Sequence, residues 1–176
     1  HVPDLEQGRP VAEVILGLGR GLSSAARSLL ARWLARYAQD ARALPLSQMK
    51  QLLKAHGPDP VAIAQVAGLA PVVVMRRLAS LPVDVLPDPV GLAICDASGV
   101  LTYRKPLPDF PMPRFGAACP IWPLYKALNR PYAVLASDLV ALGRAGTILR
   151  AEAQAAAIDA VAVNHDPVFE SHMLVR

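Results

Sequence analysis

The chain has 176 residues, of which 53% are hydrophobic, 18% are charged and 5% are aromatic. This apolar content suffices for a buried core, so the composition excludes global disorder, and leucine, valine and alanine must do most of the packing. We find neither the ~18 consecutive apolar residues of a membrane-spanning helix nor the pattern of a secretory signal at the first residues. We therefore expect a soluble cytoplasmic chain that makes no contact with a membrane.

The net charge of +4 is unevenly distributed along the chain. Residues 1–83 contain ten Lys and Arg against five Asp and Glu, whereas residues 84–176 contain eight against nine. A basic half favours an acidic partner such as nucleic acid. Five net charges spread over helices are nevertheless better explained as a solvated surface.

Residues 1–83 have the pattern of a helical subdomain. The clearest helix runs from Leu22 to Tyr37, where apolar residues recur at helical spacing and leave Arg36 on the solvated side. Proline, Ser or Asp at the start, or glycine at the end, indicates further helices over residues 10–18, 47–57, 59–67 and 71–78. Three prolines at positions 82, 87 and 89 then predict a boundary between two domains, residues 1–83 and residues 84–176.

Residues 84–176 have the pattern of strands. A first hairpin is predicted over residues 90–104, with Gly99 in the left-handed position of its turn. A short helix over residues 120–128, a second hairpin over residues 132–156 and a last strand over residues 168–175 follow. This order is typical of PAS or GAF sensor domains. The predicted fold class is therefore α+β, an N-terminal helical subdomain followed by a small antiparallel sheet.

Residues 63–81 resemble a helix-turn-helix, with Ala64, Gly68 and Val74 at the spacing of that motif. A recognition helix presents polar side chains to base edges at its N-terminal end, but residues 71–75 read Pro-Val-Val-Val-Met. The following Arg76 and Arg77 could contact phosphates without reading sequence. The segment is therefore interpreted as a buried structural helix pair.

Metal and catalytic chemistry have little support in the sequence. Cys95 and Cys119 form no CxxC pair, and His165 and His172 fall on opposite faces of one strand. Glu170 shares a face with His172, but two ligands make a poor site, and surface pairing is the simpler interpretation. Cys119 precedes a helix without any designated base, so a hydrolase or transferase remains a minor hypothesis. We expect no metal, no cofactor and no enzyme activity.

Residues 114–128 are the most distinctive segment, because they combine small residues, prolines and Trp122 around an expected helix. The helix could roof a ligand pocket on the sheet, with Arg114 or Lys126 at its mouth for an anionic group. Equally, Trp122 and Tyr125 could be core residues that cover the sheet. The candidate ligand-binding residues, chosen by motif and chemistry, are Tyr103, Arg114, Phe115, Cys119, Trp122 and Tyr125.

The segment Phe115–Tyr125, which reads FGAACPIWPLY, is similar to the signature of the short-chain fatty-acyl transcriptional regulators. The turn at residues 95–100 resembles an aspartate and glycine turn of those proteins, and residues 46–53 and 59–81 resemble their peptidase-like helical region. The resemblance covers roughly residues 40–176. It implies the C-terminal effector part of such a regulator, in which a Cro/repressor-type helix-turn-helix precedes a sensor domain for acyl-coenzyme A.

Two departures limit what the resemblance implies. Residues 163–176 lack the cysteines that hold an iron–sulfur cluster in some members, and the peptidase-like region has no zinc motif. The resemblance thus predicts a non-enzymatic, homodimeric effector-binding region that responds to a small acyl-type molecule such as short-chain acyl-CoA. DNA would be contacted only through a domain outside this chain. The alternative is a structural protein–protein interaction module without a small-molecule ligand.

Overall fold

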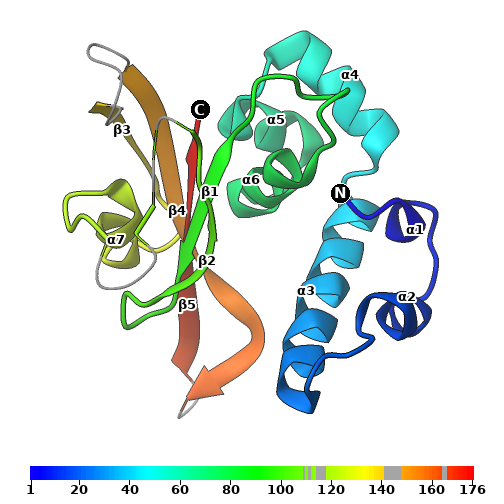
Figure 1. Cartoon of the computed structure of the whole chain (residues 1–176). Helices are drawn as coiled ribbons and strands as arrows, with labels where there is room; N and C mark the ends of the chain where they lie inside the picture. The colour runs from blue at the N-terminus through cyan, green and yellow to red at the C-terminus, as the bar shows by residue number, and fades with distance from the viewer. Residues whose placement is uncertain (109, 111, 114–117, 141–147, 164–165) are drawn as a thin grey trace.

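The structure is a computed structural model that describes residues 1–108, 110, 112–113, 118–140, 148–163 and 166–176 (Figure 1). Its first half consists of the helices α1 (Pro3–Glu6), α2 (Val11–Leu18), α3 (Ser24–Ala43), α4 (Leu46–His56), α5 (Pro60–Ala67) and α6 (Pro71–Ser80). Its second half consists of β1 (Gly91–Cys95), β2 (Leu101–Lys105), α7 (Pro123–Leu128), β3 (Val134–Val140), β4 (Ile148–Val163) and β5 (Asp166–Val175). The five strands form one antiparallel sheet in the order β2-β1-β5-β4-β3, which confirms the α+β fold class.

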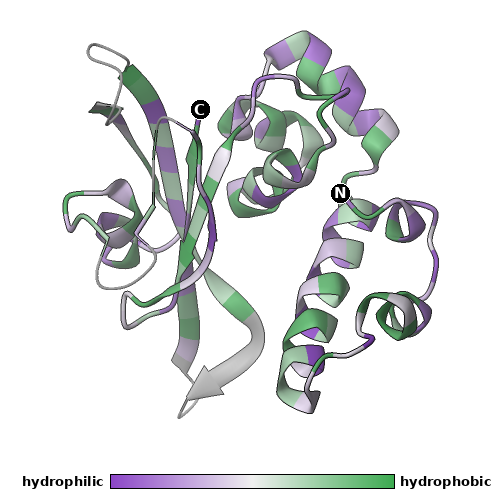
Figure 2. Ribbon diagram, viewed as in Figure 1, coloured by the Kyte–Doolittle hydropathy of each residue, from purple (hydrophilic) through white to green (hydrophobic). Residues whose placement is uncertain are grey.

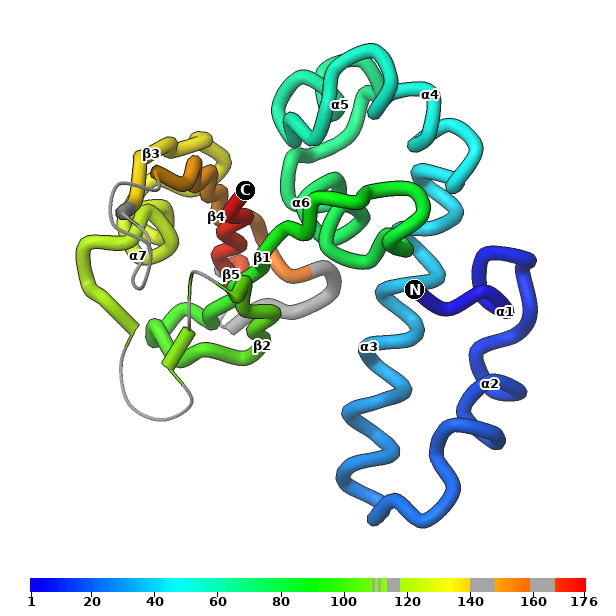
Figure 3. Tube along the Cα trace, turned by 45° about the horizontal axis from the view of Figure 1, so that its top comes forward, coloured from blue at the N-terminus to red at the C-terminus, as the bar shows by residue number. Residues whose placement is uncertain are grey.

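The sheet lies between two layers of helix. Figures 1 and 3 show α7 on one face and the helices of the N-terminal half on the other. Within that half, α6 packs directly on β1, β4 and β5, and α3 packs on α6. The helix α3 therefore lies beside the sheet, and α1 and α2 pack on α3.

Local signals place most helix ends where the sequence predicts them. Asp59 caps α5, because its Oδ1 accepts hydrogen bonds from the amides of Val61 and Ala62, both at 2.9 Å. Gly68 ends α5 in the left-handed conformation, with φ of 67°. In contrast, α3 begins at Ser24 rather than Leu22, because the side chain of Ser23 accepts from the amide of Ala26 at 3.2 Å.

Three other helices differ from the sequence prediction, and β4 continues to Val163 beyond the predicted end at residue 156. The helix α4 begins after Pro45 instead of Ser47, and the short helix α1, with a proline in its first turn, was not expected. The helix α7 begins at Pro123 rather than at residue 120. Proline is tolerated at the first helical position because the amide it lacks would have no partner there.

The two faces of the sheet belong to two apolar clusters. Along β1 alternate side chains point to opposite faces, so Ala93 and Cys95 pack towards α7 while Leu92 and Ile94 pack towards α6. Because both faces are covered, all five residues of β1 are buried. The cluster beneath α6 joins Met75 to Ile94 across the predicted boundary at residue 83. The division into two domains stays a prediction, and the two halves share this part of the core.

The helix pair α5 and α6 is structural, as the sequence predicted. The side chains of Val72, Val74, Met75 and Leu78 on α6 are buried. Arg77, which the sequence left as a residue that could contact phosphates, is only 1% exposed, and its guanidinium donates to the Glu6 carboxylate at 2.8 Å and to the carbonyl of Leu44 at 3.0 Å. This burial agrees with the interpretation of a structural helix pair, because Glu6 of α1 and Leu44 at the end of α3 cover that face of α6.

Within the described residues no single helix is long and apolar enough to cross a membrane. The pair α5 and α6 together reaches the required length and composition, but the two helices are bent by 117° at the break between them.

Candidate functional site

Two neighbouring cavities lie where α3 and α6 meet the sheet, and we call them together the junction groove. The first, the aromatic cavity, has a volume of about 90 Å³ and is lined by Trp33, Tyr37, Leu92 and Tyr103 among others. The second, the polar cavity, has a volume of about 360 Å³ and is lined by groups that include Tyr132, Gln154, Glu170 and His172. Arg36 and Arg76 line both cavities. The groove therefore receives side chains from both halves of the chain.

Five side chains form a charge ring between the two cavities: Arg36 and Asp40 of α3, Arg76 of α6, and Glu170 and His172 of β5. Arg76 donates to both carboxylate oxygens of Asp40 at 2.7 Å and contacts Nε2 of His172 at 3.2 Å. Arg36 lies one helical turn before Asp40 and forms an ion pair with Oε1 of Glu170 at 2.8 Å. The same oxygen lies 3.5 Å from Nε2 of His172. The charge ring thus closes from α3 through β5 and α6 back to α3.

The charge ring corrects two expectations from the sequence. Arg36 was expected to be solvated, but it is half-buried against Glu170, because the apolar stripe of α3 says nothing about a strand that packs beside it. His172 was expected in a surface pair with Glu170, but its side chain is completely buried. This burial follows from the position of β5, the central strand of the sheet.

His172 is a neutral imidazole in this environment. Burial, and next the positive charges of Arg76 and Arg36, lower the pKa of His172 well below the usual value for histidine. A neutral ring has one acceptor nitrogen, and the contact with Arg76 assigns that role to Nε2. The proton then sits on Nδ1, which has no hydrogen-bond partner among the described residues. The two cations of the charge ring are therefore balanced by two carboxylates.

The aromatic cavity is walled by a pair of rings from opposite halves of the chain. The ring centroids of Trp33 on α3 and Tyr103 on β2 are 4.5 Å apart, and the guanidinium carbon of Arg36 lies 6.0 Å from the Trp33 ring. Tyr103 faces the helices because the pairing of β1 with β2 shifts register between Ile94 and Cys95. Burial raises the pKa of Tyr103, so its hydroxyl stays protonated at neutral pH.

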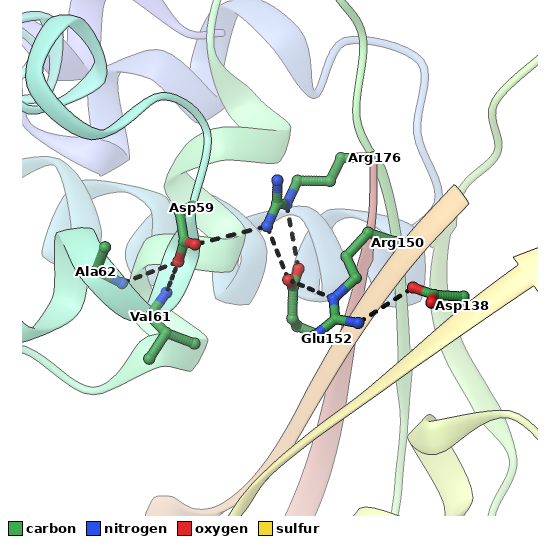
Figure 4. A network of polar contacts seen from close by, with 7 residues as sticks. All are labelled: Asp59, Val61, Ala62, Asp138, Arg150, Glu152 and Arg176. Atoms are coloured by element: carbon green, nitrogen blue, oxygen red, sulfur yellow. Dashed lines mark hydrogen bonds and ion pairs between the residues drawn. The ribbon is translucent and has the colours of Figure 1, made fainter. Parts of the chain in front are cut away.

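A second polar network lies at one end of the same sheet face (Figure 4). The buried carboxylate of Glu152 accepts from Arg176 at 2.8 Å and from Arg150 at 3.4 Å, and Arg150 also reaches Asp138 at 3.1 Å. Arg176 in turn lies 3.6 Å from Asp59, the residue that caps α5. This network joins the end of β5 to the start of α5.

Backbone contacts add two further links between the helices and the sheet. The side-chain oxygen of Gln154 accepts from the amide of Val72 at 3.3 Å, at the start of α6. At the other end of α6, the amine of Lys105 donates to the carbonyl of Ala79 at 2.7 Å, and burial lowers the pKa of that amine. Both ends of α6 are therefore hydrogen-bonded to strands.

The structure does not bring the predicted ligand-binding residues together. Trp122 and Tyr125 lie on the α7 face of the sheet and Tyr103 lies on the opposite face, while Cys119 is exposed. Arg114 and Phe115 are outside the described residues. A ligand-binding role for this set stays a prediction.

Trp122 has the packing of a core residue. It is 7% exposed, its ring lies 5.2 Å from that of Phe110, and the neighbouring Leu124 and Ala127 are fully buried. The side chains that the sheet presents to this cluster include Ala93, Ala151, Ala153 and Ala155, all with no exposed surface. This packing agrees with the second of our two interpretations, in which Trp122 covers the sheet.

Sequence reasoning missed Trp33, Arg36, Asp40 and Arg76 as groove residues. The shared face of Glu170 and His172 was a correct signal, and Arg36 and Asp40 stand four residues apart on a helix. No local pattern, however, indicates that α3 lies beside β5, because that contact joins residues more than 130 positions apart.

The described part of the chain contains no feature that supports catalysis or metal binding. That part contains no group of three His, Cys, Asp or Glu side chains that could hold a metal ion. Both cysteines are free, and burial raises the pKa of the Cys95 thiol to about 11, which keeps this thiol unreactive. The arrangement is that of a groove in which two arginines face two carboxylates.

Neither the models of known protein families nor the curated proteins include a match to this chain. Among solved structures, a Mycobacterium tuberculosis transcriptional regulator is similar, with a TM-score of 0.67 and 21% sequence identity. The alignment covers 94% of this chain and 50% of that protein, so this chain spans about half the length of the regulator. At this identity the comparison establishes that the two chains share a fold.

Proposed function

We propose that this chain is the effector-sensing region of a transcriptional regulator, with a small acyl-type molecule such as a short-chain acyl-CoA as its effector. The junction groove carries this proposal, because its walls come from α3 and α6 on one side and from the sheet on the other. The shared fold with a Mycobacterium tuberculosis transcriptional regulator supports it. The region would bind without catalysis, form a homodimer and act on DNA through a domain outside this chain.

A ligand in the junction groove would be sensed through the links that cross it. Arg36 joins α3 to β5 through Glu170, and Arg76 joins α6 to β5 through His172. A ligand shifts an equilibrium between two conformations only as far as it binds one of them better. An effector that competes for these arginines would favour a different placement of the helices against the sheet. That displacement is the signal that the missing domain would receive.

Thermal unfolding with a panel of short-chain acyl-CoA esters tests the proposal. A ligand at 100 times its dissociation constant should stabilise the chain by about 2.7 kcal/mol, and free coenzyme A serves as the control for the acyl group. The Tyr103→Ala variant should lose the stabilisation, whereas Tyr125→Ala, on the α7 face, should keep it. Absence of any shift with every ester would contradict an acyl-CoA effector.

A structural interaction module is the second candidate function. The enclosure of Trp122 by core side chains favours it, because the segment that looked most like a ligand pocket is packed. The large exposed side chains of Leu16, Leu18 and Leu29 on α2 and α3 also suit a protein contact. Under this alternative no small molecule would shift the unfolding temperature, and Leu29→Glu would change the oligomeric state measured by analytical ultracentrifugation.

A further inference from the structure

We propose that the junction groove binds a small monocarboxylate with a short apolar tail, and that the ligand's carboxylate takes the place of Glu170 on Arg36. The tail would occupy the aromatic cavity beside Trp33 and Tyr103. This inference rests on the proposed function, since it names the class of ligand for the same groove.

Glu170 is the exchangeable carboxylate of the charge ring. Asp40 is held by two 2.7 Å hydrogen bonds from Arg76, and its side chain is 8% exposed. Glu170 is 12% exposed and receives one 2.8 Å contact from Arg36, whose own side chain is 28% exposed. The neutral His172 offers Glu170 no proton at Nε2, because that nitrogen accepts from Arg76. A ligand carboxylate therefore displaces Glu170 from Arg36 more easily than it displaces Asp40 from Arg76.

The charge balance of the charge ring selects a monoanion. With Glu170 in place, two arginines face two carboxylates around a neutral histidine. When Glu170 turns out into the polar cavity, one guanidinium without an anion remains in a half-buried site. One ligand carboxylate restores the balance and matches the planar donor face of the guanidinium, whereas a neutral amide or alcohol does not.

The dimensions of the groove favour a short chain next to the charged group. The aromatic cavity holds about 90 Å³, roughly three times the ~30 Å³ share of a water molecule in the liquid, so it admits a tail of a few carbons. The guanidinium of Arg36 lies 6.0 Å from the Trp33 ring, so the anion and the tail must be adjacent in the ligand. In an acyl-CoA the thioester beside the acyl group is neutral, and the phosphates lie at the far end of the pantetheine arm. A free carboxylate fits both requirements.

Binding in this manner breaks one link and keeps the other. Release of Glu170 removes the contact between α3 and β5, while Arg76 still joins Asp40 to His172. The ligand is thereby coupled to the position of α3 against the sheet.

Isothermal titration calorimetry of the whole chain tests this inference with propionate, butyrate and hexanoate, against butyramide as the uncharged control. We expect the carboxylates to bind and the amide to fail. Glu170→Gln removes the competing carboxylate and should tighten butyrate binding about tenfold, equivalent to about 1.4 kcal/mol. Arg36→Gln should weaken it at least tenfold. Arg32→Gln, which removes an exposed arginine from the same helix, is the matched control and should change nothing.

The opposite signs of the two variants separate binding from folding. A variant that merely damages the fold weakens binding, so tighter binding by Glu170→Gln has no such explanation. The inference is overturned if no carboxylate binds, if butyramide binds as well as butyrate, or if Glu170→Gln leaves the affinity unchanged. Acyl-CoA binding without carboxylate binding would overturn it and leave the proposed function standing, whereas failure of both ligand classes would reject both.

Discussion

The two faces of the sheet bury different kinds of side chain. Towards α7, β4 presents Ala151, Ala153 and Ala155, whose small side chains let the helix and the Trp122 ring approach closely. Towards α6, the alternate residues of the same strand are Glu152 and Gln154, which are almost as buried but hydrogen-bonded. Figure 2 shows this alternation of hydrophobic and hydrophilic residues along β4.

The two kinds of contact differ in what they contribute. Apolar packing adds to the free energy of unfolding, whereas buried ion pairs provide groups that a ligand can contact. Apolar packing gains free energy from area removed from water and leaves no group that a ligand could satisfy. A buried ion pair adds little net stability, because desolvation offsets the attraction, but each partner can exchange for another group of the same charge. Apolar packing covers the α7 face, whereas the α6 face combines the apolar contacts of Leu92 and Ile94 with the two cavities and the ion pairs of the charge ring. Four predictions test this contrast.

The largest effect is expected for Trp122→Ala on the α7 face. Truncation of a large aromatic side chain in a core costs about 3–5 kcal/mol of unfolding free energy, because the cavity left behind closes only partly. Urea denaturation measures the loss, and the milder Trp122→Phe variant keeps the comparison possible if the alanine variant is unfolded. Butyrate and acyl-CoA binding by Trp122→Phe should equal that of the parent. Loss of binding in a stable variant would instead return the ligand site to the α7 face.

For Arg76→Met on the α6 face we expect a comparable loss of unfolding free energy, which a second substitution at Asp40 should largely restore. The substitution leaves Asp40 buried without its partner, at a cost of about 3 kcal/mol. The double variant Asp40→Leu/Arg76→Met removes both charges and should regain most of that loss. Chemical denaturation of the single and double variants gives the coupling energy. Additive effects would show that the pair is not isolated from water, contrary to its burial here.

Sequence reasoning located the elements whose determinants are local. The Asp59 cap, the left-handed Gly68 and the β1–β2 turn with Gly99 at φ of 83° each depend on residues within a few positions of one another. The α+β class followed from the succession of these elements, whereas the order of the strands in the sheet was not predicted. The apolar first turn of α6 likewise argues against base reading by this helix, which stays a prediction.

The candidate site depended on contacts that no local pattern encodes. The face of Tyr103 is decided by a register shift between β1 and β2, and the role of Arg36 by the placement of α3 beside β5. Helical periodicity identified the apolar stripe of α3, but Leu29 within that stripe is exposed, while Arg36 outside it is paired. Periodicity shows which side of a helix is apolar and does not show what lies beside its edges.

A smaller, pH-dependent effect is expected from His172. Its pKa is lowered in the folded chain by burial and by Arg76 and Arg36, so the unfolded chain binds the proton more readily. Stability is therefore fully present above the ordinary histidine value of about 6.5 and falls as the pH drops below it. A single such group contributes a loss of about 1 kcal/mol between about pH 7.5 and about pH 5.5.

The groups that face His172 do not reverse this sign. Asp40 of α3 and Glu170 of β5 are carboxylates, Arg76 and Arg36 are cations that oppose protonation of the ring, and Gln154 of β4 and Ile94 of β1 are uncharged. Denaturation of the parent and of His172→Gln at several pH values isolates the contribution, since glutamine retains a hydrogen-bond acceptor for Arg76. An equal slope in both proteins would mean that His172 takes up its proton as readily in the folded chain as in the unfolded chain.

The smallest change in stability is expected for substitution of Asp138, the exposed end of the polar network around Glu152. Asp138 pairs with Arg150 at 3.1 Å, but the two side chains are 64% and 47% exposed, so water and salt screen the pair. We expect Asp138→Asn to leave the denaturation midpoint unchanged within error. Glu152→Gln, one step further in, is the matched control: it removes a buried charge that holds Arg176 and should lower the midpoint measurably. Equal effects of the two substitutions would show that the polar face is organised by charge along its whole length rather than by burial, and the contrast with the α7 face would then lose its physical basis.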